Sequence, residues 1–208
     1  MENVLSEINK EFNYQIEEYK NYQEDVAKLS DIINQSSNNI YFCGIGKSGN
    51  MAKHCSDLLK SINYPSFYLE LINLNHGDIG TLKINDIIII FSNSGNTNEL
   101  INLIPLFKNK NVKTIGICNN KDSKFNLVCD ITFTLPFKNE ISGDIDKIPT
   151  NSVMSQLIFI NILVSFLKKN IDVNKYKLNH LGGDIGRKLL KIKDCLILDY
   201  PKIIIDKS

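Results

Sequence analysis

Two short polar segments of this sequence combine residue types that can bind phosphate. The first, Gly44–Gly49, reads GIGKSG, fits the pattern G-x-G-x-x-G and follows an apolar run. The second, Ser92–Thr97, reads SNSGNT and follows the apolar run DIIIIF. Backbone N–H groups at the start of a helix, together with hydroxyl donors, can surround one phosphate monoester. The two segments therefore predict a phosphate site at two strand-to-helix turns.

The first segment alone is compatible with other phosphate sites. A Walker A loop is disfavoured, because it requires a glycine where this chain has Tyr41. A dinucleotide site agrees with the glycine spacing and with Glu70, which follows the next predicted strand where a ribose-binding acid would stand. It leaves Lys47 unexplained, since a cation at a helix start calls for an anionic or oxygen-rich ligand. It also needs no second loop such as Ser92–Thr97. Helix capping is the structural alternative for that loop, but capping needs only one hydroxyl group.

The remaining sequence predicts the elements that position these segments. Apolar residues recur every three or four positions over residues 2–36, which predicts a helix that covers the domain core or, alternatively, packs on a second subunit. Strands and helices then alternate. The strands are predicted at 40–43, 66–69, 86–91, 112–118 and 131–135, and the helices at 47–61, 96–108 and 151–169. Pro105 is expected to bend or shorten the second of these helices. A short helix is expected near Gly186, and the tail CLILDYPKIII is open to an edge strand or a partner-binding segment.

Repeated strand–helix units predict an α/β fold, with a doubly wound parallel sheet and helices on both faces. In such sheets, ligands bind beyond the carboxyl ends of the strands. One domain is expected over residues 1–208. It comprises an N-terminal helix over 1–36, a core over 37–195 and a C-terminal tail over 196–208.

Composition excludes several classes of partner. The 208 residues carry a formal net charge of +1 without a block of like charge, which argues against nucleic acid or an anionic membrane. No apolar run reaches the roughly 18 residues of a membrane span, and the N-terminus lacks a signal core, so a cytoplasmic protein is expected. The five scattered cysteines predict buried reduced thiols. Neither they nor the histidines show metal-ligand spacing, so no metal is expected.

Five segments together resemble the SIS (sugar isomerase) domain. They are Gly44–Gly49, the HGDIG of 76–80, the SNSGNTNE of 92–99, Pro149–Thr150 and the NHLGGDIGRKLL of 179–190. More narrowly, they are similar to D-arabinose 5-phosphate isomerases, in matching order from about residue 30 to 195. The resemblance implies a five-stranded parallel sheet of flavodoxin-like or Rossmann-like type.

The resemblance also implies an activity. Such enzymes interconvert D-ribulose 5-phosphate and D-arabinose 5-phosphate through an enediol, without metal or other cofactor, on the way to the sugar Kdo. Family members are usually homotetramers whose sites are completed by neighbouring subunits. By position, the implied phosphate-binding residues are Ser48, Ser92, Asn93, Ser94 and Thr97. The residues implied around the sugar are Lys47, His76, Glu99, Glu140 and His180.

The chemistry of these side chains suggests roles for them. Glu99 or Glu140 is the expected base, and the sequence does not choose between them. The structural alternatives are charge complementarity at a helix start for Glu99 and a solvated loop charge for Glu140. His76 and His180, in glycine-flanked loops, are candidates for ring opening or proton shuttling. Lys47 would stabilise the enediolate, and its alternative is a solvent-facing charge.

The sequence departs from the family at Asn151 and Leu181, where serine and proline are common, and it lacks the usual pair of CBS modules. Regulation through such modules is therefore expected to be absent. Three alternatives stay open: a non-catalytic SIS sensor of sugar phosphates, an isomerase of another sugar phosphate, and a nicotinamide-dependent oxidoreductase. Retention of both glutamates and both loop histidines favours the enzyme over the sensor, and Ser92–Thr97 disfavours the oxidoreductase.

Overall fold

A computed structural model describes residues 2–141, 148–173, 176, 179, 180, 184 and 188. The chain divides after Asn170 into two units, and each is described by itself. Gly186, near which a short helix is expected, and the tail 196–208 lie outside the described residues.

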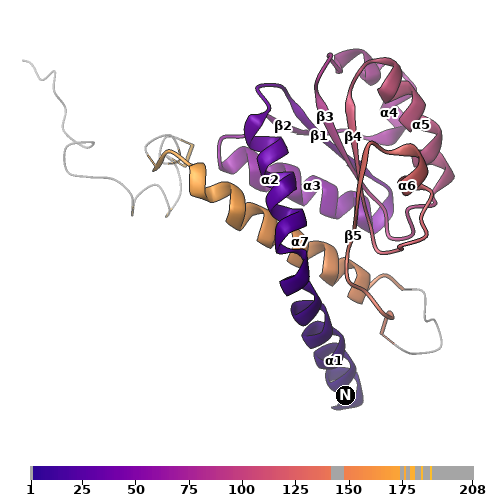
Figure 1. Cartoon of the computed structure of the whole chain (residues 1–208), viewed down its shortest axis with the longest axis vertical. Coiled ribbons are helices and arrows are strands. Elements are labelled where there is room, and N and C mark those ends of the chain that lie inside the picture. Colours follow the sequence, from indigo (N-terminus) through magenta and orange to yellow (C-terminus); the bar gives the residue numbers. More distant parts are fainter. Residues whose placement is uncertain are drawn as a thin grey trace, which may run out of the picture. The chain divides into compact units, whose positions relative to one another are not determined.

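The first unit alternates strands and helices (Figure 1). Its strands are β1 (Ile40–Gly44), β2 (Ser66–Tyr68), β3 (Ile87–Phe91), β4 (Lys113–Cys118) and β5 (Ile131–Thr134). Its α-helices are α1 (Glu2–Tyr19), α2 (Gln23–Gln35), α3 (Gly46–Ser61), α4 (Leu71–Leu74), α5 (Asn98–Asn109), α6 (Phe125–Val128) and α7 (Asn151–Leu167). Short 3₁₀ turns occur as η1 (Lys20–Tyr22), η2 (Asp78–Thr81) and η3 (Lys168–Asn170).

The five strands form one parallel sheet in the order β2-β1-β3-β4-β5, which confirms the predicted doubly wound α/β fold. The order reverses between β1 and β3, the switch point at which α/β sheets bind ligands. Gly44 at the end of β1 is in register with Phe91 at the end of β3. The two polar segments therefore leave the sheet side by side.

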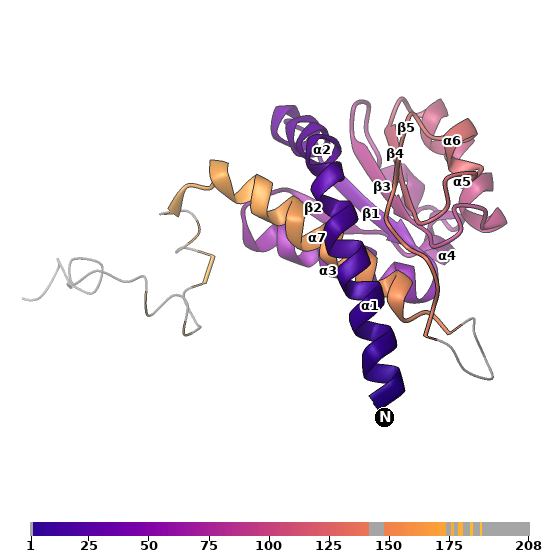
Figure 2. The same cartoon turned by 60° about the horizontal axis from the view of Figure 1, so that its bottom comes forward.

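Helices cover both faces of the sheet, as Figures 1 and 2 show, with α2, α3 and α7 on one side and α4, α5 and α6 on the other. Alternate strand residues serve the two faces. On the first face, the ring of Phe91 lies 6.5 Å from those of both Phe42 and Phe159. On the second, Ile88 and Ile90 belong to one buried cluster with Phe107 of α5. Each large side chain buried in this way contributes about 1.5–3 kcal/mol to folding.

The N-terminal segment is two helices rather than the single predicted one, because η1 tightens the chain between α1 and α2. Tyr19, at this junction, is buried and its hydroxyl donates to the carbonyl of Ser155, 2.6 Å away. The core interpretation is correct for α2 but wrong for much of α1. That helix extends beyond the sheet in Figures 1 and 2 and leaves Leu5 60% and Phe12 41% exposed.

Helix α7 is an interior element of this unit. The stretch Asn151–Asn170 is long and apolar enough to cross a membrane by length and composition alone. Here, however, α7 packs against α1, α2 and α3, and Phe159, Ile160 and Leu163 are buried. Burial in the core explains its apolar composition.

Two smaller expectations concern Pro105 and the cysteines. Pro105 does not shorten α5, which continues to Asn109, and the buried Phe107 anchors that last turn. Four cysteines lie in the described part of the chain, and all are free thiols. Cys43, Cys55 and Cys118 are buried as predicted, Cys129 is partly exposed, and Cys195 lies outside the described residues.

Candidate active site

A cavity of about 390 Å³ lies where β1 and β3 end. It is lined by the turn into α3, the loop after β3 and the first turn of α7, with Phe91 and Leu100 from the interior. The lining residues from the turns are Ile45, Gly46, Lys47, Ser48, Ser92, Asn93, Ser94, Thr97, Pro149, Ser152 and Val153. Both segments predicted to bind phosphate therefore face one cavity.

The first wall depends on close contact between a strand end and a helix start. A Cβ atom on Gly49 would lie 2.7 Å from the carbonyl oxygen of Gly44, so only glycine permits this approach. Helix α3 then begins at Gly46 without a side-chain cap, which leaves its first N–H groups available. Ser48 is 9% exposed and lines the cavity, whereas Lys47 is exposed at its edge.

The second wall is a loop held by its own hydroxyl groups. Ser92 Oγ accepts from the N–H of Gly95 at 3.0 Å, and Ser94 Oγ accepts from the N–H of Asn96 at 3.1 Å. Ser92 Oγ also lies 3.2 Å from Thr97 Oγ1. In the bonds from Gly95 and Asn96, the two serine hydroxyls act as acceptors through their lone pairs. Apart from the hydrogen shared between Ser92 and Thr97, the hydroxyl hydrogens of this loop can therefore donate to a ligand. Helix α5 follows with no side-chain cap from Thr97.

The third wall, the start of α7, differs from the other two because Glu140 already occupies its first N–H groups. The Glu140 carboxylate accepts from the N–H groups of Thr150 at 2.8 Å and Ser152 at 3.1 Å, and from both of their hydroxyls. Two uncapped helix starts, several hydroxyl donors and the ammonium of Lys47 thus surround the cavity. This arrangement is suited to an anion.

The structure brings together six of the ten predicted site residues. Lys47, Ser48, Ser92, Asn93, Ser94 and Thr97 all line the cavity. Glu140 does not line it, but it bonds to Ser152, which does. Glu99, in the first turn of α5, is exposed and makes no hydrogen bond or ion pair with any residue the structure describes.

His76 is not among the residues that line this cavity. His76 is exposed in the turn after α4, where its backbone N–H donates to the carbonyl of Asn73 at 2.9 Å. His180 belongs to the second unit, and its Nδ1 lies 2.8 Å from the carbonyl oxygen of Tyr176. Its ring centroid is 4.3 Å from that of Tyr176.

Sequence reasoning missed a buried polar residue beside the cavity. Gln156 is fully buried in α7, and its Nε2 lies 3.1 Å from Ser48 Oγ. The available signal was an amide inside an apolar helix, one turn after Ser152 and so on the same face.

Cysteine and metal chemistry find little support near this cavity. Cys43 lies in β1 beneath it, and burial raises the pKa of the Cys43 thiol to about 12. That thiol is therefore protonated at neutral pH and is a poor nucleophile. Within the described ranges, no three His, Cys, Asp or Glu side chains are grouped to hold a metal ion.

Comparison with known proteins agrees with this geometry. The SIS domain model matches residues 32–166. The chain is 30% identical over 193 residues to arabinose 5-phosphate isomerase KdsD of Yersinia pestis, covering 91% of this chain and 58% of that protein. It is 28% identical over 183 residues to KpsF of Escherichia coli, covering 87% and 58%. An uncharacterized protein of Chlamydia muridarum is 33% identical over 182 residues, covering 86% and 55%.

Solved structures show the same fold. A Listeria monocytogenes protein assigned as a sugar-phosphate isomerase superposes with a TM-score of 0.76 at 27% identity, covering 86% of this chain and 97% of that chain. An Escherichia coli protein in complex with arabinose 5-phosphate gives a TM-score of 0.70 at 24% identity, covering 86% and 93%.

The chain spans 53–58% of the length of the curated relatives it matches. It is homologous to the arabinose 5-phosphate isomerases KpsF and KdsD over most of its own length. With the matched domain, the parallel sheet and a polar cavity at its switch point, this chain belongs to the SIS domain family.

Proposed function

We propose that this chain is an aldose–ketose isomerase that interconverts D-ribulose 5-phosphate and D-arabinose 5-phosphate. The observation that carries the proposal is the cavity where the Lys47–Ser48 turn and the Ser92–Thr97 loop meet. Homology to KpsF and KdsD supports this substrate over other sugar phosphates. The product would then serve Kdo-type sugar biosynthesis.

In this proposal, the phosphate occupies the cavity and fixes the sugar. Ser48, Ser92, Asn93, Ser94 and Thr97 supply donors to its oxygens, and the uncapped starts of α3 and α5 add N–H groups. Binding energy at the phosphate then orients the reacting carbons.

The reaction transfers one proton between neighbouring carbons. A carboxylate removes a proton from C1 of the ketose, the electron pair forms the C1–C2 double bond, and the C2 carbonyl oxygen takes a proton. Return of a proton to C2, with loss of the O1 proton, gives the aldose. Lys47 stabilises the negative charge that develops on the enediolate. No metal or other cofactor takes part in this scheme.

Glu99 and Glu140 are the two proposed bases. Glu99 is the side chain without a partner among the described residues, in the first turn of the helix that follows the phosphate loop. Glu140 is held at the start of α7 and would need to act while bonded to Thr150 and Ser152. A positioned base contributes roughly 10²–10⁴-fold to the rate.

His76 and His180 are proposed to open the sugar ring or to shuttle protons in a site completed by neighbouring subunits. We propose a homotetramer, which the exposed apolar side chains Leu5 and Phe12 of α1 support. Neither nucleic acid nor a membrane is proposed as a partner, and the proposed location is the cytoplasm.

A non-catalytic sensor of sugar phosphates is the second candidate. The observation that favours it is that the Glu140 carboxylate already serves as a helix cap, while His76 lies away from the cavity lining. A sensor would keep the anion site and need no base.

Incubation with D-ribulose 5-phosphate in deuterated water separates the two candidates. The isomerase forms D-arabinose 5-phosphate that carries deuterium at C2. Binding without turnover would instead establish the sensor. Turnover of a different sugar phosphate at a higher kcat/KM would reassign the substrate.

A further inference from the structure

We propose that Gln156 is a positioning residue of the anion site, which acts by orienting the hydroxyl group of Ser48. The inference rests on the proposed binding of sugar phosphate. Gln156 is fully buried in α7, behind Ser48, and its Nε2 donates to Ser48 Oγ at 3.1 Å. Ser48 in turn lines the cavity, so one hydrogen bond links this buried amide to the ligand site.

The direction of that hydrogen bond determines what Ser48 can do. A serine hydroxyl has one hydrogen to donate and two lone pairs to accept with. Because the Gln156 amide donates into a lone pair of Ser48, the Ser48 hydrogen stays available. The oxygens of an ionised phosphate can only accept, so they need that hydrogen. Gln156 therefore sets Ser48 as a donor toward the cavity.

Asn119 is a second neighbour of the Gln156 amide and connects it to the loop after β3. Nε2 also lies 3.5 Å from Oδ1 of Asn119, an oxygen that favours a donor as its neighbour. The backbone N–H of Asn119 donates to the carbonyl of Asn93 at 2.9 Å, so the loop that binds Gln156 also holds the phosphate loop.

Packing alone does not account for an amide at this position. Gln156 Oε1 and Asn119 Nδ2 are both buried, and neither has a hydrogen-bond partner among the described residues. Such unpaired polar atoms destabilise a folded protein, whereas leucine would fill a similar space without that cost. A function at Ser48 gives the amide a reason to be there.

A double-mutant cycle tests the inference on the full chain. Dissociation constants for arabinose 5-phosphate and inorganic phosphate are measured by calorimetry for the wild type, Gln156→Leu, Ser48→Ala and the double variant. We expect Gln156→Leu to weaken binding about threefold to tenfold, the value of one hydrogen bond. In the Ser48→Ala background, Gln156→Leu should change affinity less than about twofold, because the group it orients is absent. The turnover assay should show a raised KM and a smaller change in kcat, since the phosphate contact is the same throughout the reaction.

Two further variants separate orientation from general stability. Gln156→Glu keeps the side-chain shape but accepts from Ser48, so it should bind more weakly than Gln156→Leu. The loss of affinity in Gln156→Glu, compared with the wild type at the same pH, should become smaller as the pH falls, because the protonated carboxyl is a donor.

Thr114→Val is the matched control, because it removes a buried hydroxyl bonded to Asp130 at the amino end of β4. It should lower the melting temperature and leave affinity unchanged.

Three results would overturn the role of Gln156: equal losses in both Ser48 backgrounds, wild-type affinity in Gln156→Leu, or wild-type affinity in Gln156→Glu. A wild type that binds sugar phosphate but does not isomerise it would end the proposed activity alone, and the cycle would still decide the role of Gln156. A wild type that binds neither ligand would end both proposals.

Discussion

The Glu140 carboxylate and Ser152 are joined twice, through the Ser152 N–H at 3.1 Å and its hydroxyl at 2.5 Å. Ser152 lines the cavity, so Glu140 fixes the position of one cavity wall. A carboxylate at a helix start also stabilises the helix through its dipole and free N–H groups. Glu140 therefore has a structural role in the described unit, whatever it contributes to proton transfer.

Glu140→Gln should lower both stability and turnover. The amide keeps one acceptor but loses the charge, so we expect unfolding to become easier by about 1 kcal/mol. Thermal melting and turnover, measured on the same samples, check this. Glu99→Gln is the comparison: because Glu99 has no described partner, it loses only its favourable charge in the first turn of α5, and its melting temperature should fall less than that of Glu140→Gln. If Glu99→Gln lowers turnover at least a hundredfold and Glu140→Gln only in proportion to folding, Glu99 is the base.

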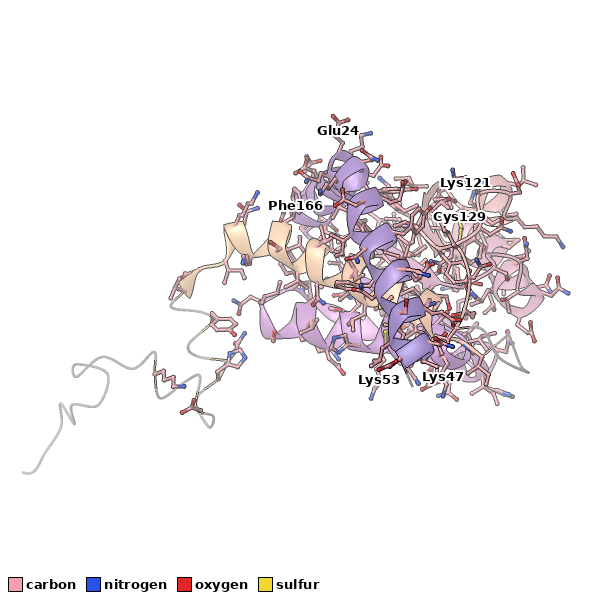
Figure 3. All side chains as sticks on the ribbon, turned by 90° about the horizontal axis from the view of Figure 1, so that it is seen from below. Glu24, Lys47, Lys53, Lys121, Cys129 and Phe166 are labelled. Carbon is pink, nitrogen blue, oxygen red and sulfur yellow. The ribbon has the colours of Figure 1, made fainter. Side chains whose placement is uncertain are left out.

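Lys47→Ala should reduce activity without reducing stability. Lys47 is exposed in the first turn of α3, where a cation is unfavourable to the helix, so its removal should leave the melting temperature equal or slightly higher. Turnover should fall by about tenfold or more, as a charge near the enediolate is lost. Lys53→Ala is the matched control on the same helix, and Figure 3 labels both lysines. Equal activity of the two variants would contradict the role of Lys47.

Gly95→Ala should destabilise the Ser92–Thr97 loop. Gly95 has φ +62°, and a Cβ there would lie 2.6 Å from the Cβ of Ser123. We expect a loss of at least about 2 kcal/mol together with weaker phosphate binding. Chemical denaturation and calorimetry check both effects. Gly80→Ala, where a Cβ meets nothing within 4 Å, should retain wild-type stability. A Gly95→Ala variant as stable as Gly80→Ala would show that the loop tolerates a side chain.

Asp130→Asn should lower stability in a pH-dependent manner. Burial raises the pKa of Asp130, but hydrogen bonds from the Thr114 N–H and hydroxyl, and the ion pair with Lys108, outweigh burial and leave the pKa below its usual value of 3.8. A lowered folded-state pKa means that the stabilisation is complete above the unfolded pKa and is lost as the pH falls through the folded one. The difference in unfolding free energy between wild type and Asp130→Asn should therefore be constant near pH 7 and shrink below about pH 4. A difference that is unchanged down to pH 2 would contradict this assignment.

Much of the fold could be predicted from the sequence because its patterns are local. The run Ile87–Phe91 is apolar throughout, which is typical of a strand buried on both faces, and glycine at Gly44 and Gly49 marks a close strand–helix turn. Parallel strands bring their carboxyl ends to one edge, so the meeting of Lys47 with the Ser92–Thr97 loop also followed from the order of elements.

The remaining features depend on which helix faces meet, and no local pattern records that. The periodicity of α1 and α2 is similar, yet Leu29 is buried and Leu5 is exposed, because α1 runs past the sheet it was expected to cover. Likewise, Glu140 was read as either a base or a solvated charge, and only the packing of α7 put helix N–H groups beside it.

The sequence by itself determined an α/β chain with two polar turns at the switch point of a parallel sheet, since strand and helix periods and turn residues act over a few positions. Only the tertiary structure decided that Gln156 lies behind Ser48, 108 positions away, and that Glu140 caps α7. Contacts of that range arise when whole elements pack to bury their apolar faces. Polar side chains on the packed elements then form hydrogen bonds with residues far away in the sequence, and the residues next to them in the sequence do not specify these bonds.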